Sequence, residues 1–202
     1  MLFRSINKEV LNDEVLADLG VNRDELRKEK SIEVGNIFNL GTRFADAMDL
    51  KYKDDKGETQ KVWMGSYGIG PARLMGTIVE LYASENAMTW PMSVAPFQLH
   101  MITIGKSKDD QSYKVSEDIY NKLKEAGAEV LWDDRVEVTA GEKFADADLL
   151  GMPMRVTISE RSLTAGGVEL VDRSQAYKDN TLINKEILSI DAFLKSYTEN
   201  CK

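Results

Sequence analysis

The chain has 202 residues, of which 43% are hydrophobic and 30% charged, and its net charge at pH 7 is −8. This length allows one large domain or two small ones, and the composition is that of a soluble globular protein rather than a disordered one. The single cysteine, Cys201, excludes a disulfide framework and a cysteine zinc site. The acidic charge argues against broad, nonspecific nucleic-acid binding but leaves room for a small, shaped RNA site.

Targeting and metal-binding signals are missing from the sequence. The longest apolar runs fall short of the roughly 18 residues that a membrane span needs, and the N-terminus has no apolar signal-peptide core. We therefore expect a cytoplasmic protein that does not enter a membrane. The single histidine, His100, lies in an alternating apolar stretch, so we expect a structural strand residue and no metal site.

The first thirty residues are predicted to be helical. Apolar residues recur near helical spacing before Gly20, which is suited to ending a helix: Leu11, Val15, Leu16 and Leu19. A short second turn is expected to begin at Asn22, because Glu25 follows three residues later in the pattern of a capping box.

The pattern changes to strands at residue 31. Residues 51–70 are predicted to form two strands joined by a turn at residues 54–57. Residues 71–85 then predict a helix with Pro71 in its first turn, where a proline's missing N–H costs nothing. The expected buried stripe of this helix is Leu74, Ile78 and Leu81.

Two prolines, Pro91 and Pro96, bracket a short connector that we interpret as the domain boundary, giving domains 1–92 and 93–202. After it, strands are expected at 97–105, 128–134, 154–160 and 166–173, and helices at 112–127, 141–151 and 181–198. This alternation predicts an α/β domain whose sheet contains parallel pairs. Residues 1–95 carry a net charge of −3 and residues 96–202 of −5, so any RNA contact must use a few placed cations.

The most informative segment lies between a predicted strand and a predicted helix. Gly65, Gly68 and Gly70 allow close approach of a ligand, and the following helix start suits an anion. Arg73 in the first helical turn could reach a phosphate or stack on a base. A tight turn followed by a surface arginine explains the same residues.

The sequence GSYGIGPARL, residues 65–74, resembles the third signature motif of class II aminoacyl-tRNA synthetases, and is most similar to that of the bacterial prolyl enzymes. The resemblance implies that Arg73 is the catalytic arginine that binds ATP, with Gly68 and Gly70 beside it. The family's cysteine beside the proline pocket is replaced here by Ser66, which keeps the size but loses the thiol.

Residues 31–48, SIEVGNIFNLGTRFADAM, resemble the preceding segment of the same family. The resemblance implies that Glu33 helps to position ATP or its Mg²⁺, and that Asn36 and Phe38 line the proline pocket. Asn36 replaces the family's histidine and can hydrogen-bond but not carry a proton at neutral pH. A core strand with alternating apolar residues would explain this segment without any ligand.

The second half resembles the class II anticodon-binding domain, first in APFQLHMITI and then in LWDDR and GEKFADADLLGMPMRVTIS. The resemblance implies that anticodon bases are bound by Arg135, Glu142, Lys143 and Phe144. Such cations and carboxylates suit base edges, and an aromatic ring suits stacking. The alternatives are a solvated strand end with internal ion pairs for Arg135 and an inward, core position for Phe144.

The resemblance covers residues 31–200 and implies the C-terminal part of a prolyl-tRNA synthetase: a partial antiparallel catalytic sheet followed by a mixed-sheet anticodon-binding domain. Its partners would be tRNA(Pro), proline and ATP, with a homodimer for the full enzyme and no DNA. Nothing in residues 1–30 resembles the first two class II motifs, so we expect the chain alone to be inactive in proline activation. The alternatives are a non-catalytic tRNA-binding accessory protein and a threonyl, glycyl or histidyl relative.

Overall fold

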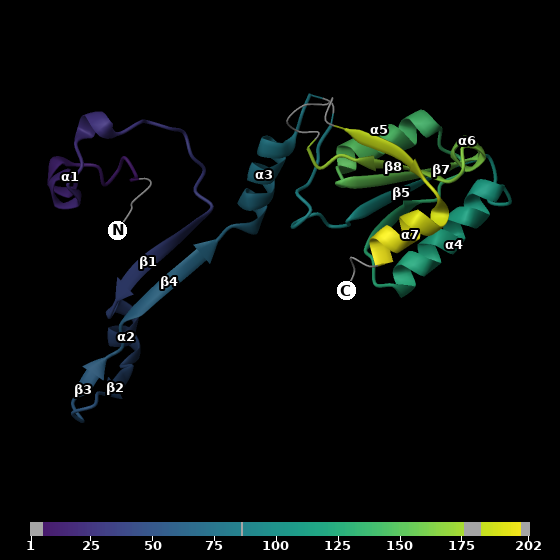
Figure 1. Ribbon diagram of the computed structural model, residues 1–202. Helices are drawn as coiled ribbons and strands as arrows, with labels where there is room; N and C mark the ends of the chain where they lie inside the picture. The colour runs from purple at the N-terminus through teal and green to yellow at the C-terminus, as the bar shows by residue number, and fades with distance from the viewer. Residues whose placement is uncertain (1–5, 86, 176–182, 199–202) are drawn as a thin grey trace. The chain divides into compact units, whose positions relative to one another are not determined.

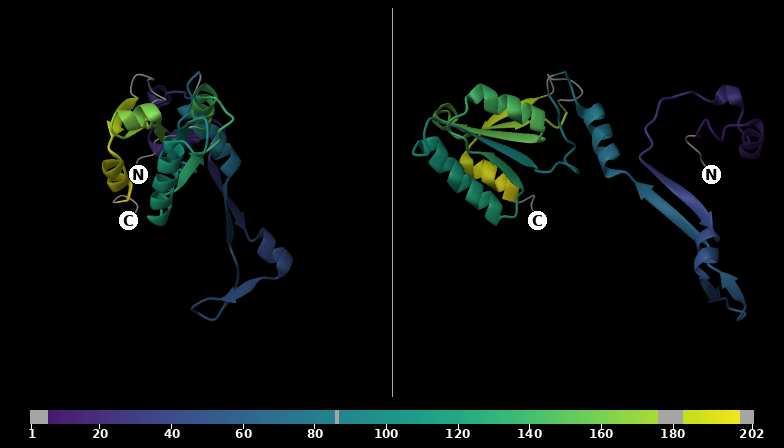
Figure 2. Two further views of the ribbon diagram at one scale, coloured as in Figure 1. Left: turned by 90° about the vertical axis from the view of Figure 1, so that its right-hand side faces the viewer. Right: turned by 180° about the vertical axis from the view of Figure 1, so that it is seen from behind.

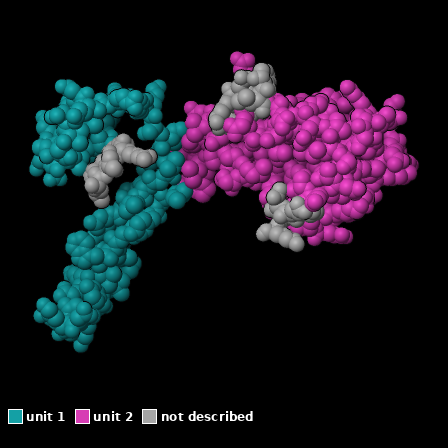
Figure 3. Space-filling view, viewed as in Figure 1, with its two compact units in different colours: residues 1–69 teal, residues 70–202 magenta. Residues whose placement is uncertain are grey.

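The computed structural model describes residues 6–85, 87–175 and 183–198. It forms two compact units, residues 1–69 and residues 70–202 (Figure 3). Within the described ranges no helix is both long and apolar enough to cross a membrane. Cys201 lies outside the described residues.

The first unit begins with two short helical segments and continues as two antiparallel strand pairs. Its elements are α1 (Asp13–Leu19), the 3-10 turn η1 (Arg23–Glu25), β1 (Gly35–Gly41), α2 (Arg43–Met48), β2 (Lys51–Lys53), β3 (Thr59–Lys61) and β4 (Met64–Ile69). The expected helix end at Gly20 is confirmed, because this glycine has the left-handed φ of 66°. The expected turn at Asn22 is also confirmed, and its backbone N–H donates to Glu25 at 3.0 Å.

The strands of this unit pair differently from the sequence expectation. The turn after β2 is present, with Gly57 N donating to Asp54 O at 2.9 Å, but β2 pairs only with the short β3. Residues 64–69 instead form β4, which pairs with β1 in a separate two-stranded ribbon (Figure 1). The predicted turn and its two flanking strands are therefore confirmed in β2 and β3, but the second strand does not continue to residue 70 as expected, because residues 64–69 form a separate strand with another partner.

The second unit begins with a helix and continues as the α/β domain. Its elements are α3 (Pro71–Tyr82), β5 (Leu99–Ile104), α4 (Gln111–Glu125), β6 (Val130–Asp133), α5 (Ala140–Leu150), β7 (Met154–Ser159), α6 (Glu160–Thr164), β8 (Val168–Asp172), β9 (Asn184–Leu188) and α7 (Ile190–Thr198). The buried stripe expected on α3 is not formed: Leu81 is 63% exposed, and Leu74 and Ile78 are only half-buried. No residue of α3 is buried in the described part of the chain.

Five strands form one mixed sheet in the order β6-β5-β7-β8-β9. The strands β6 and β7 run parallel to β5, whereas β8 and β9 are antiparallel to their neighbours. The helices α4 and α7 cover one face of the sheet and α5 covers the other, as the views in Figures 1 and 2 agree. The expected α/β domain with parallel pairs is therefore confirmed.

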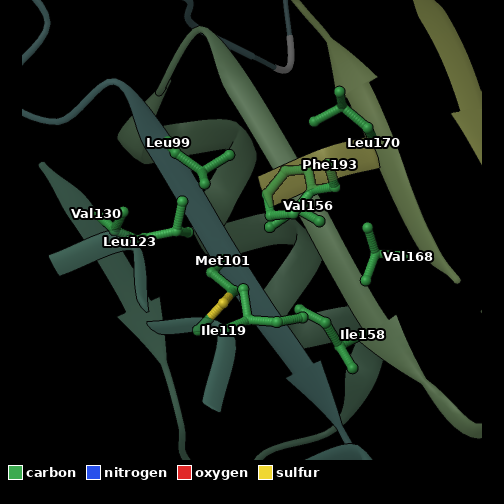
Figure 4. Close-up of a cluster of buried hydrophobic side chains, with 10 residues drawn as sticks. All are labelled: Leu99, Met101, Ile119, Leu123, Val130, Val156, Ile158, Val168, Leu170 and Phe193. Atoms are coloured by element: carbon green, nitrogen blue, oxygen red, sulfur yellow. The ribbon is translucent and has the colours of Figure 1, made fainter. Parts of the chain in front are cut away.

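The hydrophobic core lies between the sheet and the pair of helices α4 and α7 (Figure 4). Alternation along β5 sends Leu99 and Met101 into this core and His100 and Ile102 to the face under α5. From the helices, Ile119, Leu123 and Phe193 complete the cluster, and all three are fully buried. Burial on both faces fixes the register of β5, because a slip of one residue would exchange its two sets of side chains.

Two assignments near the C-terminus need correction. The segment expected as one final helix contains strand β9 followed by α7, and its first two residues, 181 and 182, lie outside the described residues. Strand β9 forms because it completes the edge of the sheet by pairing with β8, from Val168 opposite Leu188 to Asp172 opposite Asn184. The short helix α6 was not expected from the sequence.

The connector between α3 and β5 is fastened to the end of α5. Trp90 donates from its backbone N to Gly151 O at 2.8 Å and from Nε1 to Leu150 O at 3.1 Å. A left-handed φ of 72° at Gly151 lets the helix end there. The domain boundary at residue 92 stays a prediction.

Replacing Thr139 with alanine should lower the free energy of unfolding by about 1 kcal/mol. Thr139 caps α5, and its Oγ1 accepts a hydrogen bond from Glu142 N at 3.3 Å. Urea unfolding followed by circular dichroism would measure the loss, with Thr139→Ser as the matched variant that keeps the acceptor. Equal losses in both variants would contradict the capping role.

Candidate functional site

The β1–β4 ribbon brings together residues that lie about thirty positions apart. Asn36 pairs with Gly68, and Phe38 pairs with Ser66. Because strand side chains alternate between faces, Asn36, Phe38 and Ser66 lie on one face of the ribbon. The three residues predicted to line one small-molecule pocket are therefore neighbours on that face.

Glu33 and Asn36 are also in contact, since Asn36 Nδ2 donates to Glu33 Oε1 at 3.0 Å. A side chain at Gly68 would lie only 3.0 Å from Asn36 Oδ1, so the glycine leaves the room that this amide occupies. A polar group of Glu33 and Asn36 thus lies next to the exposed ring of Phe38, which is 52% exposed. This face offers both hydrogen-bonding groups and an apolar surface.

The two remaining residues of the expected nucleotide site stand at the start of α3. Gly70 is the N-cap and accepts from Leu74 N at 2.9 Å, and Pro71 occupies the first helical turn. Arg73 is exposed in this turn. Free N–H groups and a cation at a helix start form a local environment suited to an anion.

A second cluster lies at the end of β6, where Arg135 is held by two carboxylates. Its Nε donates to Asp133 Oδ1 at 2.9 Å, and its Nη2 donates to Asp133 Oδ2 and to Asp146 Oδ2, both at 2.7 Å. These bonds use three of the five guanidinium donors, which leaves Nη1 for a ligand. The Arg135 side chain is 40% exposed, so that ligand can come from solvent.

A cavity of about 470 Å³ opens beside Arg135, between β6 and α5. Its walls combine apolar and charged side chains: His100, Leu131, Trp132, Asp133, Asp134, Arg135, Asp146, Leu149 and Leu150. Binding sites for small planar groups have this character, with mostly apolar walls and a few placed polar groups. The cavity could accommodate a nucleic-acid base.

Lys143, which was expected at the RNA surface, is buried. Only 2% of its side chain is exposed, and its Nζ donates to Thr103 O at 2.7 Å inside the domain. Burial lowers the pKa of Lys143, while nearby Asp133 acts in the opposite direction. No surface of this side chain is left for direct contact with RNA.

The other two expected RNA residues occupy different environments. Glu142 is exposed in the first turn of α5. Phe144 is half-buried, and its ring lies 5.0 Å from the guanidinium carbon of Arg155. Phe144 is therefore partly engaged within the domain, and Glu142 remains open to a ligand.

Among the groups that line the cavity, Asp133 and His100 have lowered pKa values. Burial alone would raise the pKa of Asp133, but the hydrogen bonds from Arg135 lower it by more. The net pKa of this carboxyl therefore lies below its usual value. Burial lowers the pKa of His100 to about 4, although the charge of Asp133 acts against this. At neutral pH the cavity therefore has a charged carboxylate and a neutral imidazole in its wall.

Sequence reasoning did not assign Asp133, Asp146, Tyr113 or His100 to this site. The spacing of Asp133 and Arg135, two residues apart at a strand end, is a local signal that could have found the first pair. Asp146 and Tyr113 come from distant segments, and Tyr113 Oη donates to Arg135 O at 2.9 Å. Only the tertiary structure shows that they meet.

Two protein families match different parts of this chain. Residues 98–198 match the anticodon binding domain, and residues 17–82 match the tRNA synthetase class II core domain (G, H, P, S and T). These two matched ranges contain all of the candidate residues described above.

Curated relatives with similar sequences are proline–tRNA ligases. The enzyme of Geobacillus thermodenitrificans (strain NG80-2) is 48% identical over 145 residues, which cover 72% of this chain and 25% of the relative. That of Geobacillus sp. (strain WCH70) is 42% identical over 170 residues, covering 84% and 30%. The chain thus spans between a quarter and a third of the length of these relatives.

Solved structures share the fold. The prolyl-tRNA synthetase of Cryptosporidium parvum, complexed with L-proline and AMP, superposes with a TM-score of 0.65 over 84% of this chain and 37% of that one. Because the sequence identity of this pair is 22%, the match supports a shared fold and nothing further. It agrees with the partial class II catalytic sheet and the mixed-sheet domain expected from the sequence.

Proposed function

Because this chain belongs to the prolyl-tRNA synthetase family of class II aminoacyl-tRNA synthetases, we propose that it serves the ATP-dependent ligation of proline to tRNA(Pro). Residues 98–198 would bind the anticodon, and residues within the class II core match, 17–82, would contribute to binding proline and ATP. The match of residues 17–82 to a class II core supports this role over that of a tRNA-binding accessory protein without catalysis.

The observation that carries the proposal is the guanidinium of Arg135, held between Asp133 and Asp146 beside the cavity. Two fixed ion pairs keep the side chain in one orientation, which lowers the entropy lost when a base binds. The surrounding carboxylates make the site unsuited to a general phosphate contact. Recognition of a base edge fits such a mixed donor and acceptor set better.

Guanine fits the groups at this site. Arginine donors match the O6 and N7 acceptors of guanine, and a carboxylate accepts from exposed amino groups of a base. Apolar walls from Leu131 and Leu149 would cover the faces of an unstacked base. We therefore propose that at least one guanine of the anticodon is read at Arg135.

For the ligation reaction, we propose that Asn36, Phe38 and Ser66 contact proline, supported by their shared face on the β1–β4 ribbon. Arg73 would bind ATP as the catalytic arginine, with Gly68, Gly70 and Glu33 as further nucleotide contacts. Mg²⁺ would accompany the ATP phosphates, with Glu33 as a candidate to position it. A homodimer and a cytoplasmic location remain predictions for the full enzyme.

Replacing Arg135 with alanine should weaken binding of tRNA(Pro) by about 1–3 kcal/mol, because the guanidinium contacts to the base are lost. Filter-binding titrations of the chain at one fixed salt concentration would measure this. Transcripts with each anticodon base changed in turn would identify the base that is read. The variant should no longer discriminate at that position.

The control is Arg27→Ala, which removes an exposed arginine of the first unit. Its affinity for tRNA should equal that of the unchanged chain. If Arg135→Ala behaves like Arg27→Ala, the assignment of the anticodon site fails. If the unchanged chain binds all transcripts equally, the proposed recognition of the anticodon fails as a whole.

A further inference from the structure

Among the described residues of the anticodon-binding unit, Lys143 is a lysine that is buried rather than exposed. Lys143 lies in the first turns of α5, on the side that packs against the sheet, and 2% of its side chain is exposed. Burying a flexible ammonium group is costly unless its charge is compensated and its donors are satisfied. Both conditions are met here, so the position of this cation is specified by the fold.

The ammonium group connects three other elements. Its Nζ donates to Thr103 O at the end of β5 at 2.7 Å and to Tyr113 Oη of α4 at 3.4 Å. It also lies 3.5 Å from Asp133 O and 3.7 Å from Asp133 Oδ1, at the end of β6. These partners occupy all three ammonium donors, which leaves none for an outside ligand.

Two of these partners hold Arg135 directly. Asp133 accepts from the Arg135 backbone N at 3.2 Å as well as from its guanidinium, and the Tyr113 hydroxyl donates to Arg135 O. Lys143 therefore contacts the groups that fix both the backbone and the side chain of Arg135. None of these hydrogen bonds joins Lys143 to Arg135 directly.

We propose that Lys143 is a positioning residue: it sets the orientation of Arg135 through Asp133 and Tyr113 and makes no contact with RNA. The part of this inference that concerns RNA affinity rests on the proposed anticodon recognition. The part that concerns the orientation of Arg135 does not, because it can be measured on the protein alone.

The first measurement follows the Arg135 side chain by NMR in the full chain without RNA. In the unchanged protein, the Nε–H of Arg135 is bonded to Asp133, so its resonance should be slow to exchange with water. Lys143→Met, which keeps the length of the side chain but removes the charge, should make this resonance exchange faster or disappear. Lys122→Met, which removes an exposed lysine of α4, should leave it unchanged.

The second measurement is a double-mutant cycle on tRNA affinity. Lys143→Met should weaken binding about tenfold in the unchanged background and have no further effect in the Arg135→Ala background. The slope of log affinity against log salt concentration should stay the same, because no phosphate contact is lost. Direct contact with a phosphate would instead reduce that slope by about 1.

If Lys143→Met does not fold, Tyr113→Phe provides the same test, because it deletes only the hydroxyl that links Lys143 to Arg135 O. We expect faster exchange of the Arg135 resonance and about a threefold loss of affinity. The proposal is overturned by an unchanged Arg135 resonance, by additive losses in the cycle or by a reduced salt slope. Absence of tRNA binding by the unchanged chain would refute the proposed function, while the NMR result would still decide the role of Lys143.

Discussion

Replacing Asp133 with alanine is expected to lower the free energy of unfolding by about 3–5 kcal/mol, because the buried ammonium of Lys143 then loses its compensating charge. The side chains of Asp133 and Lys143 are 6% and 2% exposed, so water cannot replace the lost partner. Arg135 would lose its bidentate partner as well. Chemical unfolding of the chain at pH 7, followed by circular dichroism, would measure the loss.

The double variant Asp133→Ala with Lys143→Met separates charge from packing. Removing both charges should recover part of the stability lost in Asp133→Ala, since no unpaired ion remains buried. The matched control is Asp134→Ala, whose exposed pair with Lys108 should contribute at most about 1 kcal/mol. If Asp133→Ala costs no more than Asp134→Ala, the compensation of Lys143 by Asp133 is not a stabilising feature.

The sequence predicts much of the α/β domain because its local signals agree with its packing. The alternation at residues 97–105 and the helical period at residues 112–127 both match the faces that are buried, with Leu99, Ile119 and Leu123 in the core. Local patterns of this kind are reliable where propensity and burial point the same way. The β1–β4 pairing, by contrast, joins strands that lie about thirty residues apart. The sequence carries only a weak signal for which strand pairs with which.

The apolar stripe of α3 shows a different limit. The helical spacing of Leu74, Ile78 and Leu81 identifies a face that can be buried, but the period says nothing about what covers it. The structure confirms the helix, but no residue on this face is fully buried in the described part of the chain. A sequence period therefore predicts an element more securely than it predicts its burial.

For the anticodon site, residue type was a poor guide to accessibility. Arg135 and Lys143 are both basic residues of one motif region, yet 40% of the arginine side chain is exposed and 2% of the lysine. What separates them is the arrangement of Thr103, Tyr113 and Asp133 around the lysine, which come from three elements. Such convergence is a property of the tertiary fold and has no counterpart in spacing along the chain.

Lowering the pH from 6.5 to 4 should reduce the free energy of unfolding by about 3 kcal/mol through His100 alone. Burial lowers the pKa of this imidazole from 6.5 to about 4 in the folded chain. Between these two values the unfolded state binds more protons than the folded state, so stability rises with pH. The contribution is complete above pH 6.5 and is lost as the pH falls towards 4.

Replacing His100 with glutamine removes the titration while keeping a polar side chain. The difference in unfolding free energy between pH 7 and pH 4.5, measured by urea titration, should be smaller in His100→Gln than in the unchanged chain. The carboxyl groups with lowered pKa values, Asp46, Asp54 and Asp133, lose most of their contributions below about pH 4, largely outside this window. An equal pH dependence in both proteins would mean that His100 becomes protonated without unfolding, and that the cavity beside it admits enough water to solvate the charge.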